Sequence, residues 1–151
     1  MIVRKMLPNE LDVTINLCGY YAQEADIPED EYDEDAVLET IRLYSSHYEY
    51  FWFNAYDGQR PVGIIAGYVT KEPWSKTKLH AHIELIFLLE SHRTMDNFRT
   101  LLNKSEEWAR TVGATELTAG DIGINPERTQ KLYSHFDFKP GVWMGKELIN
   151  V

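Results

Sequence analysis

The sequence predicts a mixed α/β fold, in which helices cover a central β-sheet. Segments with apolar residues at helical spacing alternate along the 151 residues with short segments rich in aromatic and β-branched residues. Hydrophobic residues make up 44% and charged residues 26%, which is the balance of a globular protein of ordinary single-domain length. We therefore expect residues 1–151 to form one domain.

The chain begins with a strand and two helices. Residues 1–7 alternate weakly between apolar and polar and predict a short strand. A helix over 8–23 follows, because Pro8 suits a first turn and apolar residues recur at helical spacing behind it. After an acidic loop, Asp33 or Asp35 can cap a second helix that continues to about residue 45.

The rest of the chain alternates between strands and helices. Residues 47–55 are dense in aromatics and predict a strand, and Asp57-Gly58 predicts a tight turn to a hairpin partner over 61–70. Residues 79–89 predict the most apolar strand, whose near-continuous apolar end indicates burial on both faces. The remaining pattern predicts a helix over 96–112, a strand over 115–119, a helix over 126–135 and a strand over 142–149.

The charge of the chain is strongly acidic. Lys and Arg total 15 against 24 Asp and Glu, so the formal net charge is −9. An acidic surface repels nucleic-acid phosphates, and we expect no nucleic-acid partner. Eight of the twelve residues from Glu24 to Asp35 are acidic. This segment is either a solvated loop or an electrostatic lure for a cationic substrate or partner.

Composition also indicates the compartment. No apolar run approaches the roughly 20 residues of a membrane helix, and the N-terminus lacks the apolar core of a secretory signal. The single cysteine, Cys18, excludes an internal disulfide framework and fits a reducing compartment. We therefore expect a cytoplasmic protein without membrane contact, with Cys18 as a small core residue of the first helix.

Two other kinds of site find little support. His80, His82 and Glu84 alternate along one predicted strand and so share a face, where they could ligate a divalent ion. Paired strand histidines often face solvent or a cross-strand partner, and no fourth ligand is obvious nearby, so we expect no metal. A Ser-His-Asp hydrolase is disfavoured because no Gly-x-Ser-x-Gly sequence occurs.

The order of elements resembles that of the GNAT superfamily of N-acetyltransferases, which transfer an acetyl group from acetyl-CoA to an amine. The likeness is strongest over residues 83–138, where the run IELIFLLESHRTMDNFRTLL precedes a strand and then KLYSHFDF. It implies a GNAT-like fold with a mixed, mostly antiparallel sheet of six to seven strands flanked by about four helices. The chain is also similar to small GNAT-like proteins encoded by tailed phages.

The resemblance implies an acetyl-CoA site after the apolar strand. In the family, a loop of the form Arg/Gln-x-x-Gly-x-Gly/Ala brings backbone N–H groups and a helix N-terminus to the pyrophosphate. Arg93 matches the first position, whereas Asp96 and Phe98 replace the small residues, so we expect weak binding. The implied cofactor-binding residues are Ile86, Phe87, Leu88, Arg93, Thr94, Asp96, Asn97, Phe98 and Asn125.

The resemblance also implies two catalytic residues. Glu84 lies within the central strand, where burial would make its carboxylate a stronger base for an ammonium substrate. Tyr133 matches the family tyrosine that can protonate the leaving thiolate. The structural alternatives are an ion pair for Glu84 and a packing role between helix and sheet for Tyr133.

The function that follows is an acetyl-CoA-dependent N-acetyltransferase acting on a cationic amine. The acceptor would be an amine-bearing small molecule or a basic protein surface, and the protein a monomer or homodimer. The alternative is a GNAT-fold binding or structural protein without catalysis, which the altered loop favours.

Overall fold

The computed structural model describes residues 1–120, 126–141 and 144–148. The chain forms two compact units, Met1–Gly120 and Asp121–Val151. The first unit contains the sheet and three of the helices, and the second contains one helix.

One mixed sheet, in the order β1-β2-β3-β4-β5, runs through the first unit. Its strands are β1 (Ile2–Lys5), β2 (Tyr50–Asp57), β3 (Arg60–Lys71), β4 (Leu79–Leu88) and β5 (Ala114–Ala119). Neighbouring strands are antiparallel except β4 and β5, which are parallel. The mostly antiparallel sheet is therefore confirmed, with five strands in the described residues instead of the six to seven expected.

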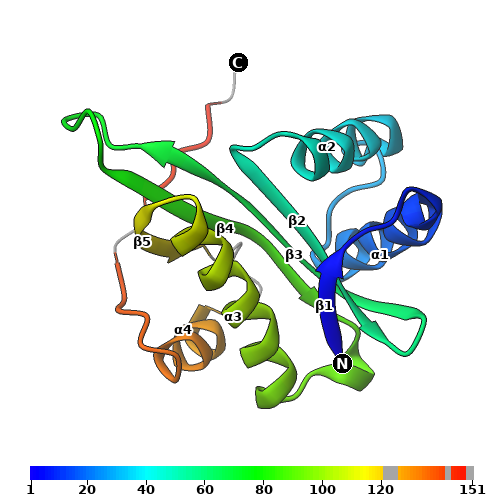
Figure 1. The fold of residues 1–151 in the computed structure, drawn as a ribbon. Coiled ribbons are helices and arrows are strands. Elements are labelled where there is room, and N and C mark those ends of the chain that lie inside the picture. Colours follow the sequence, from blue (N-terminus) through cyan, green and yellow to red (C-terminus); the bar gives the residue numbers. More distant parts are fainter. Residues whose placement is uncertain (121–125, 142–143, 149–151) are drawn as a thin grey trace. The chain divides into compact units, whose positions relative to one another are not determined.

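Helices cover both faces of this sheet. They are α1 (Leu11–Glu24), α2 (Glu34–Ser46) and α3 (Met95–Thr111), together with short 3-10 turns at Pro8–Glu10 and Glu90–His92. Helices α1 and α2 lie on one face and α3 on the other (Figure 1). The side chain of Asp33 accepts hydrogen bonds from the Asp35 and Ala36 amides, so Asp33 is the cap that begins α2. Gly113, at φ +86°, follows the end of α3.

The core has one layer on each side of the sheet. On the α1/α2 face, Cys18 and Ile41 pack with Trp52 of the sheet. On the α3 face, Trp108 lies 4.6 Å from the ring of Phe51. Burial raises the pKa of the Cys18 thiol to about 12, which keeps it protonated and confirms it as a core residue.

The second unit is built around α4 (Pro126–Ser134). Tyr133 is buried on this helix and packs edge-on against Phe138, with ring centroids 5.0 Å apart. The strand predicted over 142–149 is not formed by residues 144–148, and residues 142, 143 and 149 lie outside the described part of the chain.

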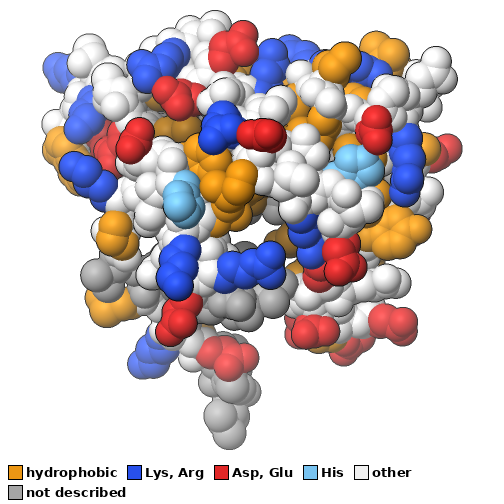
Figure 2. Space-filling view, turned by 90° about the horizontal axis from the view of Figure 1, so that it is seen from below, with side chains coloured by type: hydrophobic (Ala, Val, Ile, Leu, Met, Phe, Trp, Pro, Cys, Tyr) orange, Lys and Arg blue, Asp and Glu red, His pale blue; other side chains and the backbone are white. Residues whose placement is uncertain are grey.

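The surface carries charges of both signs. On the face shown in Figure 2, Lys and Arg side chains lie among Asp and Glu side chains and do not gather into one basic patch. Among the described residues, no helix has the length and apolar character needed to cross a membrane.

Candidate functional site

A β-bulge interrupts the pairing of β3 with β4 at Glu84. Ala66 pairs with Leu85 and Gly67 pairs with Ile83, so Glu84 has no residue opposite it. The close approach of the two strands requires glycine at position 67, where a Cβ atom would lie only 2.0 Å from the His82 carbonyl oxygen. A bulge re-aims the side chain of its extra residue, and here that residue is the predicted catalytic carboxylate.

Beyond the bulge, one edge of β4 is open. Strand β5 pairs with β4 only between Leu79 and Ile83, and no other described strand pairs with that edge of β4. The Leu89 amide donates toward β3, to the Val62 carbonyl oxygen at 2.9 Å. Because backbone groups alternate in direction along an antiparallel strand, the amides of Leu88 and Ile86 point away from β3, toward the open edge.

The Glu84 carboxylate accepts a hydrogen bond from the hydroxyl of Tyr44, which lies in α2. Desolvation and then the Glu84 carboxylate raise the pKa of Tyr44, so this hydroxyl stays protonated and remains a donor. Two further tyrosines extend the arrangement: Tyr50 lies 4.5 Å from the Tyr44 ring, and Tyr68 lies 6.5 Å from Tyr50. We call Tyr44, Tyr50, Tyr68 and Glu84 the tyrosine–glutamate cluster.

The surroundings of Glu84 differ from those expected. The sequence indicated a buried carboxylate or a structural ion pair, whereas the side chain is exposed and bonded to a tyrosine hydroxyl. The bulge is the physical reason, because it turns residue 84 out of the regular alternation of the strand.

The loop after β4 is tied to α1 through Arg93. Its Nε donates to the Leu88 carbonyl oxygen at 2.9 Å, and its guanidinium pairs with Glu24 at the end of α1. The same guanidinium lies 5.7 Å from the centre of the Phe87 ring. Arg93 thus holds the loop in place at the end of the open edge.

Helix α3 begins immediately after this loop. Thr94 caps it by accepting a hydrogen bond from the Asn97 amide at 3.1 Å, and the Asn97 side chain donates to the His92 carbonyl oxygen. The Asp96 side chain is 90% exposed and pairs with Arg99 at 2.7 Å, so an opposite charge compensates it. The Phe98 side chain is buried, so its bulk lies in the core and not on the loop surface as the sequence suggested.

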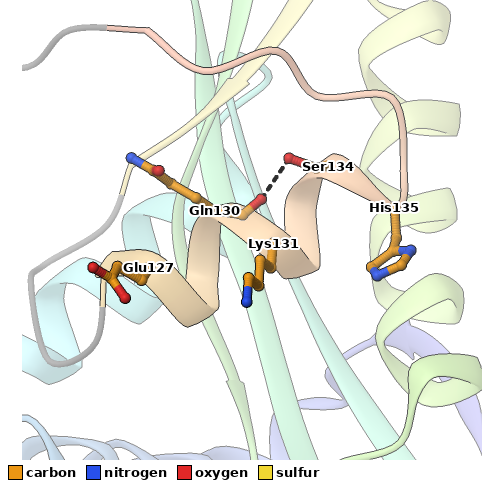
Figure 3. Close-up of a pocket in the computed structure, with 5 residues that line it drawn as sticks. All are labelled: Glu127, Gln130, Lys131, Ser134 and His135. Atoms are coloured by element: carbon orange, nitrogen blue, oxygen red, sulfur yellow. Dashed lines mark hydrogen bonds between the residues drawn. The ribbon is translucent and has the colours of Figure 1, made fainter.

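The structure therefore brings most of the predicted residues together in the first unit. Glu84, Ile86, Phe87 and Leu88 lie in β4, and the residues from Arg93 to Phe98 follow it. Tyr133 belongs to the second unit, and Asn125 lies outside the described residues. Five residues of α4 and its end, from Glu127 to His135, line a hollow of about 580 Å³, within which Ser134 donates to the Gln130 carbonyl oxygen (Figure 3).

Sequence reasoning missed the three tyrosines of the cluster. Tyr44 stood out only as an apolar position of α2, and Tyr50 and Tyr68 only as residues of β-forming segments. The residues His80, His82 and Glu84 do not act as one group. Both histidine rings contact the Thr118 hydroxyl, while Glu84 accepts a hydrogen bond from Tyr44.

Solved structures of other proteins share this fold. The fold is similar to that of a probable acetyltransferase, with a TM-score of 0.79 and 16% identity over 100% of this chain and 98% of that one. A possible acetyltransferase from Clostridium difficile 630 has a TM-score of 0.77 and 13% identity over 99% and 97% of the two chains. The aminoglycoside N-acetyltransferase AAC(6')-Iy, solved in complex with CoA, has a TM-score of 0.78 and 16% identity over 99% and 94%.

Sequence comparison identifies the family. No curated protein matched the sequence. The family model for acetyltransferases of the GNAT family matches residues 16–138, which is most of the chain. This protein belongs to the acetyltransferase (GNAT) family.

Proposed function

We propose that this protein is an acetyl-CoA-dependent N-acetyltransferase that acts on a cationic amine. The observation that supports it most directly is the position of Glu84, whose carboxylate projects from a bulge beside the open edge of β4. A proton acceptor and a row of outward backbone amides thus come from one short segment.

The tyrosine–glutamate cluster suits an ammonium group. A carboxylate attracts the charge directly, and aromatic faces attract cations through their quadrupoles. The Tyr44 hydroxyl engages one Glu84 oxygen, which leaves the other oxygen for the acceptor. An amine held there would pass a proton to Glu84, directly or through one water, and so become a nucleophile.

The open edge of β4 fits the donor. The outward amides of Ile86 and Leu88 can hydrogen-bond an amide-bearing arm and hold an acyl oxygen as charge develops on it. The N-terminus of α3, which follows the same strand, suits phosphate groups. Acetyl-CoA, when bound, supplies the activated acetyl group. By its match to the family motif, Tyr133 would donate a proton to the departing sulfur.

The neighbours support an amine acceptor. AAC(6')-Iy is by name an aminoglycoside N-acetyltransferase, and a similar enzyme from a soil metagenomic sample was solved with sisomicin. The acidic segment between α1 and α2 is in keeping with a cationic acceptor, because most of its carboxylates are exposed.

The alternative is a GNAT-fold binding or structural protein. It is favoured by the loop before α3, which has Asp96 and Phe98 where the family motif has small residues. The structure weakens this objection, since Asp96 is paired with Arg99 and Phe98 is turned into the core.

Calorimetry and turnover together distinguish the two functions. We expect heat of binding at micromolar acetyl-CoA, and release of free thiol only when a cationic amine such as a polyamine or lysine peptide is added. Glu84→Gln should lower turnover roughly 10²–10⁴-fold, the range for loss of acid–base help. The matched control is Glu39→Gln, an exposed position on α2. If calorimetry detects no heat of binding even at millimolar acetyl-CoA, the alternative function, a binding or structural protein, is the correct one.

A further inference from the structure

A group of side chains that could bind a metal ion lies near the start of β4, where β5 pairs with it. The open edge of β4 is at the other end of the same strand. Glu72 follows the last residue of β3, His80 is the second residue of β4, and Glu116 lies in β5. One ligand atom from each of the three residues lies within 4.8 Å of the other two. Along β4, four residues or about 13 Å separate His80 from Glu84, the nearest residue of the candidate acetyl-transfer site, so the two sites are distinct.

Pairing between the strands explains why these side chains meet. His80 is the direct partner of Glu116 in the parallel ladder of β4 and β5. His80 is also opposite Thr70 of β3, and the Glu72 amide donates to the Lys78 carbonyl oxygen, which extends the hairpin by one pair. Glu72 is therefore a diagonal neighbour of His80 on the same face. Strands β4 and β5 and the residue just after β3 therefore contribute one ligand each.

The distances suggest a shared central ion. His80 Nδ1 lies 3.5 Å from Glu72 Oε1 and 3.6 Å from Glu116 Oε2. Both distances exceed those of a good N–H···O bond, about 2.7–3.2 Å, so neither carboxylate is the specific partner of a ring proton. Ligands about 2.1 Å from one zinc ion in tetrahedral geometry are about 3.4 Å apart, close to the distance of His80 Nδ1 from each of the two carboxylates.

The other ring nitrogen is already oriented. His80 Nε2 lies 2.8 Å from Thr118 Oγ1, and the same hydroxyl lies 2.7 Å from His82 Nδ1. If Nε2 carries the His80 proton, Thr118 accepts that bond and donates its own proton to His82. His80 Nδ1 then presents its lone pair to the space between the carboxylates. An outer partner that sets the histidine tautomer is a usual feature of metal sites.

Burial and charge also suit a bound ion. The Glu72 and His80 side chains are only 12% and 23% exposed, whereas Glu116 is 53% exposed and leaves one side open to water. Among the described residues, the one basic side chain within ion-pair distance of either glutamate is His80. Two carboxylates that share one imidazole carry more negative charge than that ring can balance, and a divalent cation supplies the missing charge.

We propose that Glu72, His80 and Glu116 bind a divalent transition-metal ion, with Zn²⁺ the best match. One imidazole nitrogen and two carboxylate oxygens are ligands that Zn²⁺ accepts, and water fills the open position. Mg²⁺ and Ca²⁺ favour all-oxygen shells and fit less well. The sequence led us to expect no metal, because the row of His80, His82 and Glu84 offered no obvious fourth ligand. The bound ion ties the end of the β3–β4 hairpin to β5 and stabilises the folded state.

Titration of the full chain with Zn²⁺ tests the proposal. After treatment with EDTA and dialysis, we expect calorimetry to show one tight Zn²⁺ site per chain, with a rise in Tm. Glu72→Gln and Glu116→Gln should each weaken this site by more than the roughly 10- to 100-fold that loss of an outer-shell partner costs. The control is Asp57→Asn, which breaks another histidine–carboxylate pair, His92–Asp57 at 2.9 Å, and should leave the site unchanged.

Nuclear magnetic resonance locates the ion without any variant. Paramagnetic Mn²⁺ at low occupancy should broaden first the amides of residues 79–81 and 115–117, and excess Zn²⁺ should reverse this. Absence of a stoichiometric site, or Zn²⁺ affinity that is the same in Glu116→Gln and the wild type, would overturn the proposal. So would broadening centred on His92 or His135, which would reveal an adventitious ion only.

Discussion

The hydroxyl of Tyr44 in α2 donates a hydrogen bond to the carboxylate of Glu84 in β4, across 40 positions of sequence. This contact joins a helix on one face of the sheet to the bulge in its fourth strand. It orients the carboxylate beside the open edge of β4. Tyr44 is thus a positioning residue for the proposed proton acceptor.

Removal of the Tyr44 hydroxyl should separate positioning from binding. Tyr44→Phe keeps the ring beside Tyr50 and deletes only the bond to Glu84. Because a hydrogen bond to a charged group contributes about 1.5–3 kcal/mol, we expect kcat to fall about tenfold or more. Steady-state kinetics should show KM for the amine nearly unchanged. Tyr20→Phe, at an exposed position of α1, is the control, and an equal loss there would remove the positioning role.

Charge at the start of α3 should modulate acetyl-CoA affinity. Asp96 lies in the first turn, where a helix N-terminus favours anions. Asp96→Asn removes a competing negative charge from this helix end, so acetyl-CoA affinity should rise roughly two- to fivefold. Phe98 is left in place because it is buried. Calorimetry measures the acetyl-CoA affinity of each variant. The control is Glu106→Gln, which breaks a similar ion pair with Arg110 on the same helix. Unchanged affinity would show that the pyrophosphate lies elsewhere.

Loss of the Tyr133 hydroxyl tests the predicted general acid. If Tyr133 protonates the leaving sulfur, Tyr133→Phe should lower turnover roughly 10²–10⁴-fold. Acetyl-CoA affinity should change little, since the ring still packs against Phe138. Single-turnover kinetics together with calorimetry separate the two quantities. Normal turnover would leave Tyr133 as a packing residue of α4.

The acidic segment should steer a cationic acceptor to the protein. Glu29, Asp30 and Glu31 are exposed between α1 and α2, and their replacement by Gln, Asn and Gln should slow association with a polyamine at low salt. The difference should shrink as ionic strength approaches 0.15 M, where the Debye length is about 8 Å. Asp33 is retained because it caps α2.

A charge-matched control makes the steering test specific. Glu39, Glu106 and Glu107 are exposed on α2 and α3, and changing all three to Gln alters the net charge equally. If stopped-flow association has the same salt slope in both triple variants, the segment is only a solubilising loop.

Acid should destabilise the fold through Glu10. A hydrogen bond from Arg4, at 2.9 Å, holds the pKa of this carboxyl at about 2, below its ordinary value of 4.5. Between those pH values the unfolded chain binds the proton and the folded chain does not. Stability from this pair is therefore complete above pH 4.5 and is lost as pH falls toward 2, by at most about 1.4 kcal/mol per pH unit.

Urea unfolding at a series of pH values measures this contribution. Glu10→Gln should be less stable than the wild type at neutral pH, and the difference should narrow between pH 4.5 and 2. A difference that is constant with pH would mean that the Arg4 pair does not control the titration.

Local patterns in the sequence were sufficient for most of the elements and their order, with the exception of the strand expected over 142–149, which residues 144–148 do not form. Spacing of apolar residues predicted α1 to α4 and the five strands, and Asp33 was one of the two residues expected to cap α2. The run from Ile83 to Leu102 also carried the likeness to the family that the chain proves to belong to. These features depend on residues that are close together along the chain, and so the sequence alone can predict them.

Tertiary structure alone decided which side chains meet. The bulge that turns Glu84 outward depends on the register of β3 against β4, and its contact with Tyr44 depends on how α2 packs on the sheet. Glu72, His80 and Glu116 converge only because three strands pair in one register. Phe98 is buried in the core and Asp96 is exposed to solvent, because the packing of α3 on the sheet covers one side of its first turn and not the other. Register and packing are set by the burial of the whole core, which no local pattern specifies.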